Sequence, residues 1–528
     1  MSTMLSSDAP LPDPAEPTGE GRAAPLRMSA NEFRALGHEL VDSVAGFLES
    51  MAERRVTPNE SPEEVRRLID AAGALPAGGS DAAALLRSTA KLLFEHSLLN
   101  GHPRFYGYIT SSPAPIGMLG DLLAAAVNSN VGSWRLAPIA TEIESQTIRW
   151  IAELVGFPPT SDGVLVSGGN MANFVALLAA RTAAAEWGVR AGGLTAASAR
   201  PMRVYASTET HTWIQKATDL AGLGTDAIRW IPTDDDLRLD VGALRDALAR
   251  DREEGALPMM VVGTAGSVST GVVDPLREMA RLCHEAGVWF HVDGAYGALA
   301  ARVPGVPADL AAIASADSVA VDPHKWLYAP LEAGCVLVRD AALLRGAFAY
   351  HPPYYHFGQE AMNYVDFGPQ NSRGFRALKV WLALRQVGRD GYVASISTDI
   401  ALSRRMHAVA AAHPELEAIT QELSISTFRY VPAALRPQVG TTAVEDYLNR
   451  LNVAILERIQ RSGEAFVSNA VVRGRYVLRA CIVNFNTTAA DVDALPPFVA
   501  QIGREIDAEL RSEGQDARLG TAERGGSA

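Results

Sequence analysis

Six short runs rich in apolar and β-branched residues recur between residues 116 and 386, and stretches with helical periodicity separate them. The runs cover residues 163–167, 204–206, 259–264, 288–293, 318–322 and 334–338. Several are apolar throughout rather than alternating, which is typical of strands that are buried on both faces. Strands that alternate with helices predict an α/β fold, with a largely parallel sheet covered by helices on both sides.

The flanking regions differ in composition and pattern. Near the N-terminus, Ser29 and Glu32 have the spacing of a capping box, and apolar residues follow at helical intervals up to Met51. A helix with such a stripe must bury it, so we expect this region to pack on a second subunit. The expected divisions are a disordered leader at 1–27, an N-terminal helical dimerisation segment at 28–115, the large α/β domain at 116–386, a small C-terminal α+β domain at 387–511 and a disordered tail at 512–528.

Composition excludes several classes of protein. A formal net charge of −13 argues against a nucleic-acid surface, which needs a basic stripe. The three cysteines, Cys283, Cys335 and Cys481, lie far apart and predict neither a disulfide framework nor a metal site. No early apolar stretch resembles a signal peptide and no uncharged run reaches the length of a membrane span. We therefore expect a cytoplasmic protein that binds neither nucleic acid nor membrane.

The stretch Asp322-Pro323-His324-Lys325-Trp326 places a lysine between a buried strand and an apolar run. Desolvation disfavours the charged form of a lysine, and the free amine is a nucleophile suited to forming a Schiff base. Taken alone, the pentapeptide is also compatible with a lysine at a strand end whose amine reaches solvent.

Three further polar elements follow strands of the same expected sheet. Asp293 ends a strongly apolar strand, and Gly168-Gly169 join another strand to an apolar helix. His211 comes after the strand at 204–206. A glycine-rich turn at a helix start can bind phosphate, a carboxylate can face a pyridine nitrogen, and a histidine can stack on a flat ring. Separately, these residues could be a helix cap, an ordinary turn and a structural histidine.

Together, the turn, His211, Asp293 and Lys325 occur in the chain order of the aspartate-aminotransferase-like (fold type I) enzymes that use pyridoxal 5′-phosphate (PLP). The sequence also resembles the group II PLP-dependent amino-acid decarboxylases, among them the aromatic-L-amino-acid decarboxylases, from about residue 33 to residue 506. The resemblance is carried by His102-Pro103-Arg104-Phe105-Tyr106-Gly107-Tyr108, by Trp134 with Pro138-Ile139-Ala140-Thr141-Glu142-Ile143-Glu144, and by the Asp293 and Lys325 motifs.

The resemblance implies a homodimeric enzyme with PLP as cofactor and a role for each matching residue. Lys325 would form the Schiff base, His211 would stack on the ring and Asp293 would pair with the pyridine nitrogen. Ala295 would lie beneath the ring and Thr264 beside it. Asn170, Met171 and His324 would help to hold the phosphate.

The resemblance also implies a loop tyrosine that protonates the substrate Cα, which we place at Tyr354, with Tyr355 as the competing choice. The residues expected at the substrate pocket are Phe105, Tyr108, Thr110, Ser133 and Trp134, the last two matching a segment of the neighbouring subunit. These are mostly aromatic or apolar, which favours an aromatic L-amino acid as the substrate.

One departure concerns Asp322, because the aromatic enzymes of the family usually have asparagine there, and a carboxylate near a phosphate would be repelled. Three alternatives to simple aromatic decarboxylation remain open. They are an aldehyde synthase, a decarboxylase of glutamate, diaminobutyrate or histidine, and a non-catalytic interaction protein with the PLP fold. The presence of Tyr354 and His211 favours decarboxylation over aldehyde synthesis, and Lys325 and Asp293 favour an enzyme.

Overall fold

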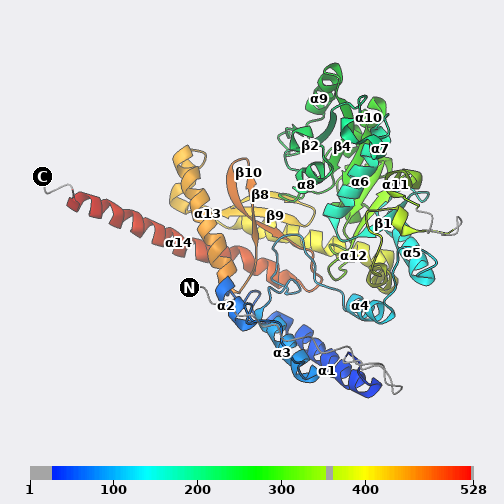
Figure 1. Cartoon of the computed structure of the whole chain (residues 1–528). Helices are drawn as coiled ribbons and strands as arrows, with labels where there is room; N and C mark the ends of the chain where they lie inside the picture. The colour runs from blue at the N-terminus through cyan, green and yellow to red at the C-terminus, as the bar shows by residue number, and fades with distance from the viewer. Residues whose placement is uncertain (1–25, 352–360, 525–528) are drawn as a thin grey trace, which may run out of the picture. The chain divides into compact units, whose positions relative to one another are not determined.

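The computed structural model of the chain describes residues 26–351 and 361–524, with side chains as far as Ser512 (Figure 1). The described chain forms two compact units. One contains the residues up to 50 together with 61–97, and the other contains 51–60 and everything from 98 onward.

The first unit is built from three helices, α1 (Ala30–Glu49), α2 (Pro62–Leu68) and α3 (Ala82–His96). The predicted capping box is confirmed, because Glu32 N–H donates to Ser29 Oγ at 3.2 Å and Ser29 N–H donates to Glu32 Oε2 at 2.8 Å. Phe47 of α1 stacks on Phe94 of α3 with ring centres 4.3 Å apart. Among the described residues, none of the α1 side chains is fully buried, and Phe33, Leu40 and Val41 are exposed.

The second unit contains a seven-stranded sheet in the order β1-β7-β6-β5-β4-β2-β3. Its strands are β1 (Asp162–Val166), β2 (Met202–Ser207), β3 (Ile228–Ile231), β4 (Leu257–Thr264), β5 (Trp289–Asp293), β6 (Ser318–Val321) and β7 (Gly334–Val338). Only β7 runs against its neighbours, β1 and β6, so the sheet is largely parallel. The six expected strands are confirmed, whereas β3 was not predicted.

Helices cover both faces of this sheet, as expected for the α/β class. They are α5 (Pro138–Val155), α6 (Gly169–Ala184), α8 (Trp213–Leu220), α9 (Val241–Glu253), α10 (Leu276–Ala286) and α11 (Ala341–Phe348). Two more helices precede α12 (Ala377–Ala412), namely α4 (Pro115–Val127), which packs on α12, and the short α7 (Val189–Gly192). On β5, His291 faces α6, where it bonds to Asn173, and the preceding Phe290 faces α10. Since neighbouring side chains of a strand point to opposite faces, α6 and α10 lie on opposite sides of the sheet.

Short 3₁₀ helices connect several elements of the second unit. They are Met51–Glu53, Gly193–Thr195, Thr225–Ala227, Gly297–Ala300, Ala308–Ser315, Tyr364–Asp366 and Ala433–Gln438.

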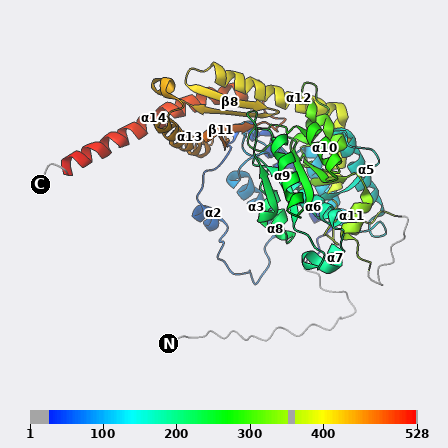
Figure 2. The ribbon, with the colours of Figure 1, turned by 90° about the horizontal axis from the view of Figure 1, so that it is seen from above.

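A long helix, α12 (Ala377–Ala412), leads from the large sheet to the smaller C-terminal part, and it is kinked at Gly388, where φ is 71°. A four-stranded antiparallel sheet follows in the order β10-β11-β9-β8. Its strands are β8 (Leu416–Glu422), β9 (Ile425–Tyr430), β10 (Ser468–Val472) and β11 (Arg475–Cys481), and its helices are α13 (Thr442–Ser462) and α14 (Ala489–Arg524). These helices and the second half of α12 share one apolar core with the sheet (Figures 1 and 2).

The C-terminal tail corrects one expectation. Residues 512–528 were expected to be disordered, but α14 continues to Arg524. The stretch after Arg511 is rich in good helix formers, and extending an existing helix by one residue is easier than starting a new one. Across the described ranges, no helix is both long enough and apolar enough to cross a membrane.

Candidate active site

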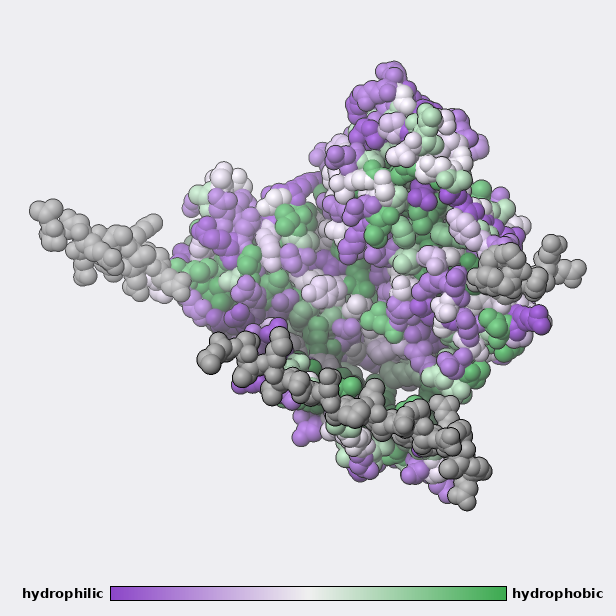
Figure 3. Space-filling model, in the orientation of Figure 1, coloured by the Kyte–Doolittle hydropathy of each residue, from purple (hydrophilic) through white to green (hydrophobic). Residues whose placement is uncertain are grey.

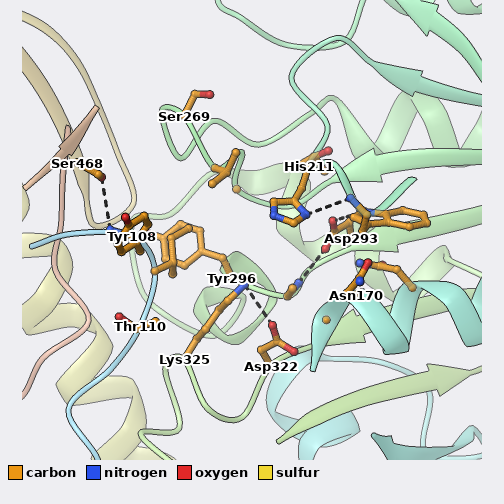
Figure 4. A pocket seen from close by; sticks show the side chains of 18 of the residues that line it. Tyr108, Thr110, Asn170, His211, Ser269, Asp293, Tyr296, Asp322, Lys325 and Ser468 are labelled. Atoms are coloured by element: carbon orange, nitrogen blue, oxygen red, sulfur yellow. Dashed lines mark hydrogen bonds and ion pairs between the residues drawn. The ribbon is translucent and has the colours of Figure 1, made fainter. Parts of the chain in front are cut away.

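The carboxyl ends of β2, β4, β5 and β6 meet at a cavity of about 380 Å³ (Figure 4). Ligands of open parallel sheets bind at this edge. The lining residues are Tyr108, Ile109, Thr110, Gly169, Asn170, Asn173, His211, Trp213, Thr264, Gly266, Val268, Ser269, Asp293, Ala295, Tyr296, Asp322, Lys325, Ser468, Asn469 and Arg479. The cavity therefore brings together eight of the residues expected from the sequence, namely Tyr108, Thr110, Asn170, His211, Thr264, Asp293, Ala295 and Lys325.

Lys325 lies in the turn after β6, with its side chain 18% exposed at the cavity. Its Nζ is 3.2 Å from Asp322 Oδ2, and His324 Nε2 is 3.6 Å from the same oxygen. The backbone of the turn is held from outside, because Ser111 Oγ donates to the carbonyl oxygen of His324 at 2.8 Å. Of the lysine side chains described, this is the one that reaches the cavity.

Asp293 ends β5 and is almost fully buried. Trp213 Nε1–H donates to Asp293 Oδ2 at 2.7 Å, and Ala295 N–H donates to Oδ1 at 3.2 Å. These two donors fix the plane of the carboxylate. Lone pairs remain on both oxygens for a further donor at the cavity.

The turn between β1 and α6 is packed closely by its neighbours. A Cβ atom on Gly334, at the start of β7, would lie 2.4 Å from Gly168 Cα, so only glycine fits there. His324 also reaches this turn, since its Cε1 is 3.3 Å from the position of a Cβ on Gly168. Asn170 lines the cavity, whereas Met171 is partly buried against the main core and is absent from the described lining.

His211 follows β2 and lines the cavity (Figure 4). Burial lowers its pKa below the usual value, Asp293 opposes that shift, and Lys325 adds to it. A neutral imidazole at physiological pH suits stacking on a flat ring. Thr264 ends β4, and its Oγ1 is buried with no hydrogen-bond partner among the described residues.

The expected substrate residues divide into two groups. Tyr108 and Thr110 line the cavity. Phe105 does not reach the described lining, because it is buried and stacks on Phe466, with ring centres 5.4 Å apart. Phe466 in turn contacts Tyr108, so Phe105 supports the wall from behind.

Ser133 and Trp134 also lie away from the described lining of this chain's cavity. The Ser133 side chain is buried, and the indole of Trp134 donates to Glu142 Oε1 at 3.0 Å. Tyr354 and Tyr355 fall outside the described residues, so their assignment as the proton donor stays a prediction.

Arg479 on β11 is the main residue of the cavity that the sequence analysis missed. It is 2% exposed, and its Nη1 donates to Tyr108 O at 3.1 Å and to Ser468 Oγ at 3.0 Å. Its Nε and Nη2 have no partner within the described chain. Burial lowers the pKa of this guanidinium, yet an arginine stays charged in proteins, so the cavity wall carries a buried cation with two free donors. A charged residue inside the apolar run at 477–483 was the available sign.

The residues present fit PLP. The turn at Gly168–Gly169 offers backbone N–H groups at a helix start, Asp293 offers an oriented carboxylate, and Lys325 offers an amine. Buried polar atoms without partners in the described residues, Thr110 Oγ1, Thr264 Oγ1 and Asp322 Oδ1, surround the same cavity. A metal site has no support, because no cluster of three His, Cys, Asp or Glu side chains suited to an ion occurs in the described ranges.

Comparison with known proteins agrees with this geometry. Residues 62–431 match the family described as the pyridoxal-dependent decarboxylase conserved domain. An aromatic-L-amino-acid decarboxylase of Bacillus atrophaeus is 32% identical over 91% of this chain and 97% of its own length. Tryptophan decarboxylase 1 of Oryza sativa subsp. japonica is 30% identical over 89% of this chain and 93% of its own. The crystal structure of Oryza sativa TDC with PLP and tryptamine superposes with a TM-score of 0.84 at 27% identity, covering 92% of this chain and all of that one.

Proposed function

The chain belongs to the pyridoxal-dependent decarboxylase family, and from this premise we propose that its substrate is an aromatic L-amino acid. Membership makes the protein a carboxy-lyase that uses PLP and releases CO2 from an amino acid. The proposed products are CO2 and the corresponding aromatic amine. The names of the Bacillus and rice relatives support an aromatic substrate.

The observation that carries this proposal is the distribution of charge in the cavity. One lysine and one arginine, Lys325 and Arg479, line its described part. Lys325 would bind the cofactor, so Arg479 remains as the partner for one substrate carboxylate. Every amino acid already has such a carboxylate on Cα. Tyr108, Ile109 and Val268 line the remainder with aromatic and apolar groups. A second carboxylate, as in glutamate, would lack a partner there.

Each residue then has a role that its contacts support. PLP, when bound, supplies the electron sink that takes the electron pair left by departing CO2. Asp293 would hold the proton at the pyridine nitrogen, and Trp213 keeps that carboxylate in plane. His211 presents a neutral ring at the cavity. Arg479 would donate hydrogen bonds to the α-carboxylate from its free Nε and Nη2. These two donors lie in one plane, an arrangement that lysine lacks.

We also propose a homodimer in which residues 28–115 contribute to the subunit interface. Ser133 and Trp134 would then serve the cavity of the partner subunit, in keeping with their distance from the cavity of their own chain. A cytoplasmic location is supported by the three cysteines, which are buried and free.

A substrate panel with detection of CO2 and amine tests the proposed substrate. We expect L-tryptophan, L-tyrosine, L-phenylalanine and L-dihydroxyphenylalanine to exceed L-glutamate, L-diaminobutyrate and L-histidine in kcat/KM by about 10²-fold or more. Arg479→Lys should raise KM for all aromatic substrates alike. Preferred turnover of glutamate or diaminobutyrate would overturn the aromatic assignment while leaving the family intact.

The anchoring lysine has its own test. Borohydride reduction of the holoenzyme followed by peptide mapping should find the pyridoxyl group on Lys325, and Lys325→Ala should abolish both the adduct and the cofactor's absorption band. The reason is that Lys325 is the lysine at the described cavity. An adduct on another lysine would refute the assignment.

A further inference from the structure

We propose that Asp322 makes this site hold the cofactor with its phosphate singly protonated, the phosphate O–H donating to Asp322 Oδ1. The inference rests on the proposed position of the cofactor between Lys325 and the turn at Gly168–Asn170. It concerns the carboxylate that stands where aromatic members of the family usually carry an amide.

The position of the carboxylate is the first step. The Asp322 side chain is 3% exposed and lies between Lys325 and the first turn of α6 (Figure 4). A Cβ atom on Gly169 would be 2.8 Å from Asp322 Oδ2, so this carboxylate touches the turn whose N–H groups suit a phosphate. Its Oδ1 is buried without a hydrogen-bond partner in the described chain.

The second step is the chemistry of two acceptors. An ionised carboxylate only accepts hydrogen bonds, and a fully ionised phosphate has no O–H to donate. A buried acceptor without a donor is costly, and two adjacent anions repel each other. A phosphate that keeps one proton can donate its O–H to Oδ1, and its smaller negative charge weakens the repulsion. The second pKa of a phosphate monoester is about 6, so this proton is within reach near neutral pH.

The third step is the set of neighbours that could neutralise Asp322 instead. Lys325 Nζ faces the other oxygen, Oδ2, at 3.2 Å, and in the holoenzyme this nitrogen would be bonded to the cofactor, so it is not the donor to Oδ1. Burial lowers the pKa of both His324 and His211, so both imidazoles favour the neutral form. Cys335 on β7 has its pKa raised well above the usual value by burial and stays a thiol.

The two remaining charged groups of the cavity do not supply a cation either. Asp293 is itself an anion, held by Trp213. Arg479 is held by Tyr108 O and Ser468 Oγ, which Figure 4 shows across the cavity from Asp322. The described groups around Asp322 therefore leave the phosphate O–H as the donor to its Oδ1.

Phosphorus NMR of the holoenzyme reports the protonation state of the phosphate and does not depend on catalytic turnover. In the wild type, the ³¹P resonance of bound PLP should stay at the singly protonated position of free PLP from pH 6 to above pH 8. In Asp322→Asn, whose amide can donate to a phosphate oxygen, the resonance should lie at the fully ionised position over most of that range. Asp399→Asn is the matched control, because it removes a buried carboxylate that contacts Trp326 on the same loop, and it should behave as the wild type.

Affinity gives a second readout. If the wild type binds only singly protonated phosphate, its Kd for PLP should rise about tenfold per pH unit above pH 6, because the dianion then dominates in solution. Asp322→Asn should lose this dependence, and pyridoxal, which has no phosphate, should bind both proteins with equal pH dependence.

A fully ionised phosphate in wild-type holoenzyme would overturn the inference, even if Asp322→Asn failed to fold. Equal pH slopes of the PLP Kd in wild type and Asp322→Asn would also overturn it. Failure of the proposed function looks different, because PLP would then give no adduct on Lys325 at any pH.

Discussion

Asp293 shows how a single side chain is prepared for its role by the residues around it. Trp213 and Ala295 each donate to one oxygen of the carboxylate, so its plane does not depend on the cofactor. An anion fixed before the ligand arrives costs no reorganisation when charge develops opposite it. This preorganisation explains why an indole lies behind the carboxylate, where a phenylalanine could have filled the space.

Asp293→Asn should therefore keep the fold and much of the cofactor but lower kcat by at least about 10²–10³-fold, because the pyridine nitrogen loses its charged partner. Trp213→Phe, which removes only the indole N–H, should cause a smaller loss. Steady-state kinetics and PLP content measured on the same samples separate the two effects. A kcat near that of the wild type in Asp293→Asn would show that the pyridine partner has been misplaced.

Tyr354 carries the sharpest residue-level prediction from the sequence. General-acid help of the kind it would give is typically worth about 10²–10⁴-fold, and Tyr354→Phe removes the proton while keeping the ring. The variant should still release CO2, but it should form less amine and should consume O2 to give aldehyde, ammonia and peroxide. Tyr355→Phe is the matched control and should do much less. Amine formation at the wild-type rate without aldehyde in Tyr354→Phe would exclude this tyrosine as the acid.

At the level of single residues, the sequence predicts groups whose chemistry is local to a motif. Lys325, Asp293 and His211 each follow a strand, and the shared edge of a parallel sheet brings them together. Arg479 was missed because its strand belongs to the small domain, where period and composition predict only a buried β-strand. Hydrogen bonds to Tyr108 O and Ser468 Oγ hold the Arg479 side chain at the cavity, and no local sequence pattern encodes these contacts.

At the level of elements, the mostly apolar strands of the large sheet were predictable, whereas β3 was not. β3 (Ile228–Ile231) is a four-residue edge strand in which Arg229 breaks the apolar run. α12 was not recognised as one element because Gly388 interrupts its helical φ and ψ, and the expected domain boundary at 386/387 falls beside this kink. The left-handed φ at this position favours glycine. Gly388 therefore allows the kink, and it is also the residue that interrupts the helical sequence pattern.

Asp399 on α12 joins the small domain to the loop that carries the lysine. Trp326 Nε1–H and Tyr328 O–H both donate to its Oδ2, at 3.0 and 2.8 Å. Burial raises the pKa of this carboxyl to about 7, despite the two donors. The group thus binds a proton more tightly in the folded protein than in the unfolded chain.

A raised folded pKa stabilises the protein at low pH, and this contribution is lost as pH rises through the interval from about 4 to 7. Asp399→Asn should flatten the pH dependence of the free energy of unfolding there, by up to about 1.4 kcal/mol per pH unit. Denaturant titrations of both proteins at several pH values between 4 and 8 measure this slope. Parallel curves for the two proteins would mean that Asp399 does not titrate in that window.

At the scale of the whole molecule, the second unit exposes an apolar surface on α4. Leu119, Leu122, Leu123 and Val127 are each about half exposed or more, between 49% and 66%. The space-filling view shows hydrophobic side chains gathered at the position of α4 (Figure 3). Together with the open apolar stripe of α1, this surface favours an obligate dimer.

Sedimentation at assay concentration should therefore find a dimer. Leu122→Glu combined with Leu123→Glu should give inactive monomers, whereas Leu220→Glu, a change at a still more exposed leucine on α8, should leave the dimer intact. The pocket should also be shared. Mixing inactive Lys325→Ala with an inactive Trp134 variant should restore activity. In each mixed dimer, one site then receives Lys325 from one subunit and Trp134 from the other. A fully active monomer would refute both expectations.

The pairing of β1 with β7 has a consequence for synthesis on the ribosome. β1 is the first strand of the large sheet to emerge, yet its partner in the ladder is β7, which starts only at Gly334. Until then an apolar strand has no place in the sheet, and such exposed edges invite aggregation. We therefore expect slow translation, low temperature and chaperones that bind nascent chains to raise the yield of folded protein. Substitutions that stabilise the folded enzyme should raise this yield less.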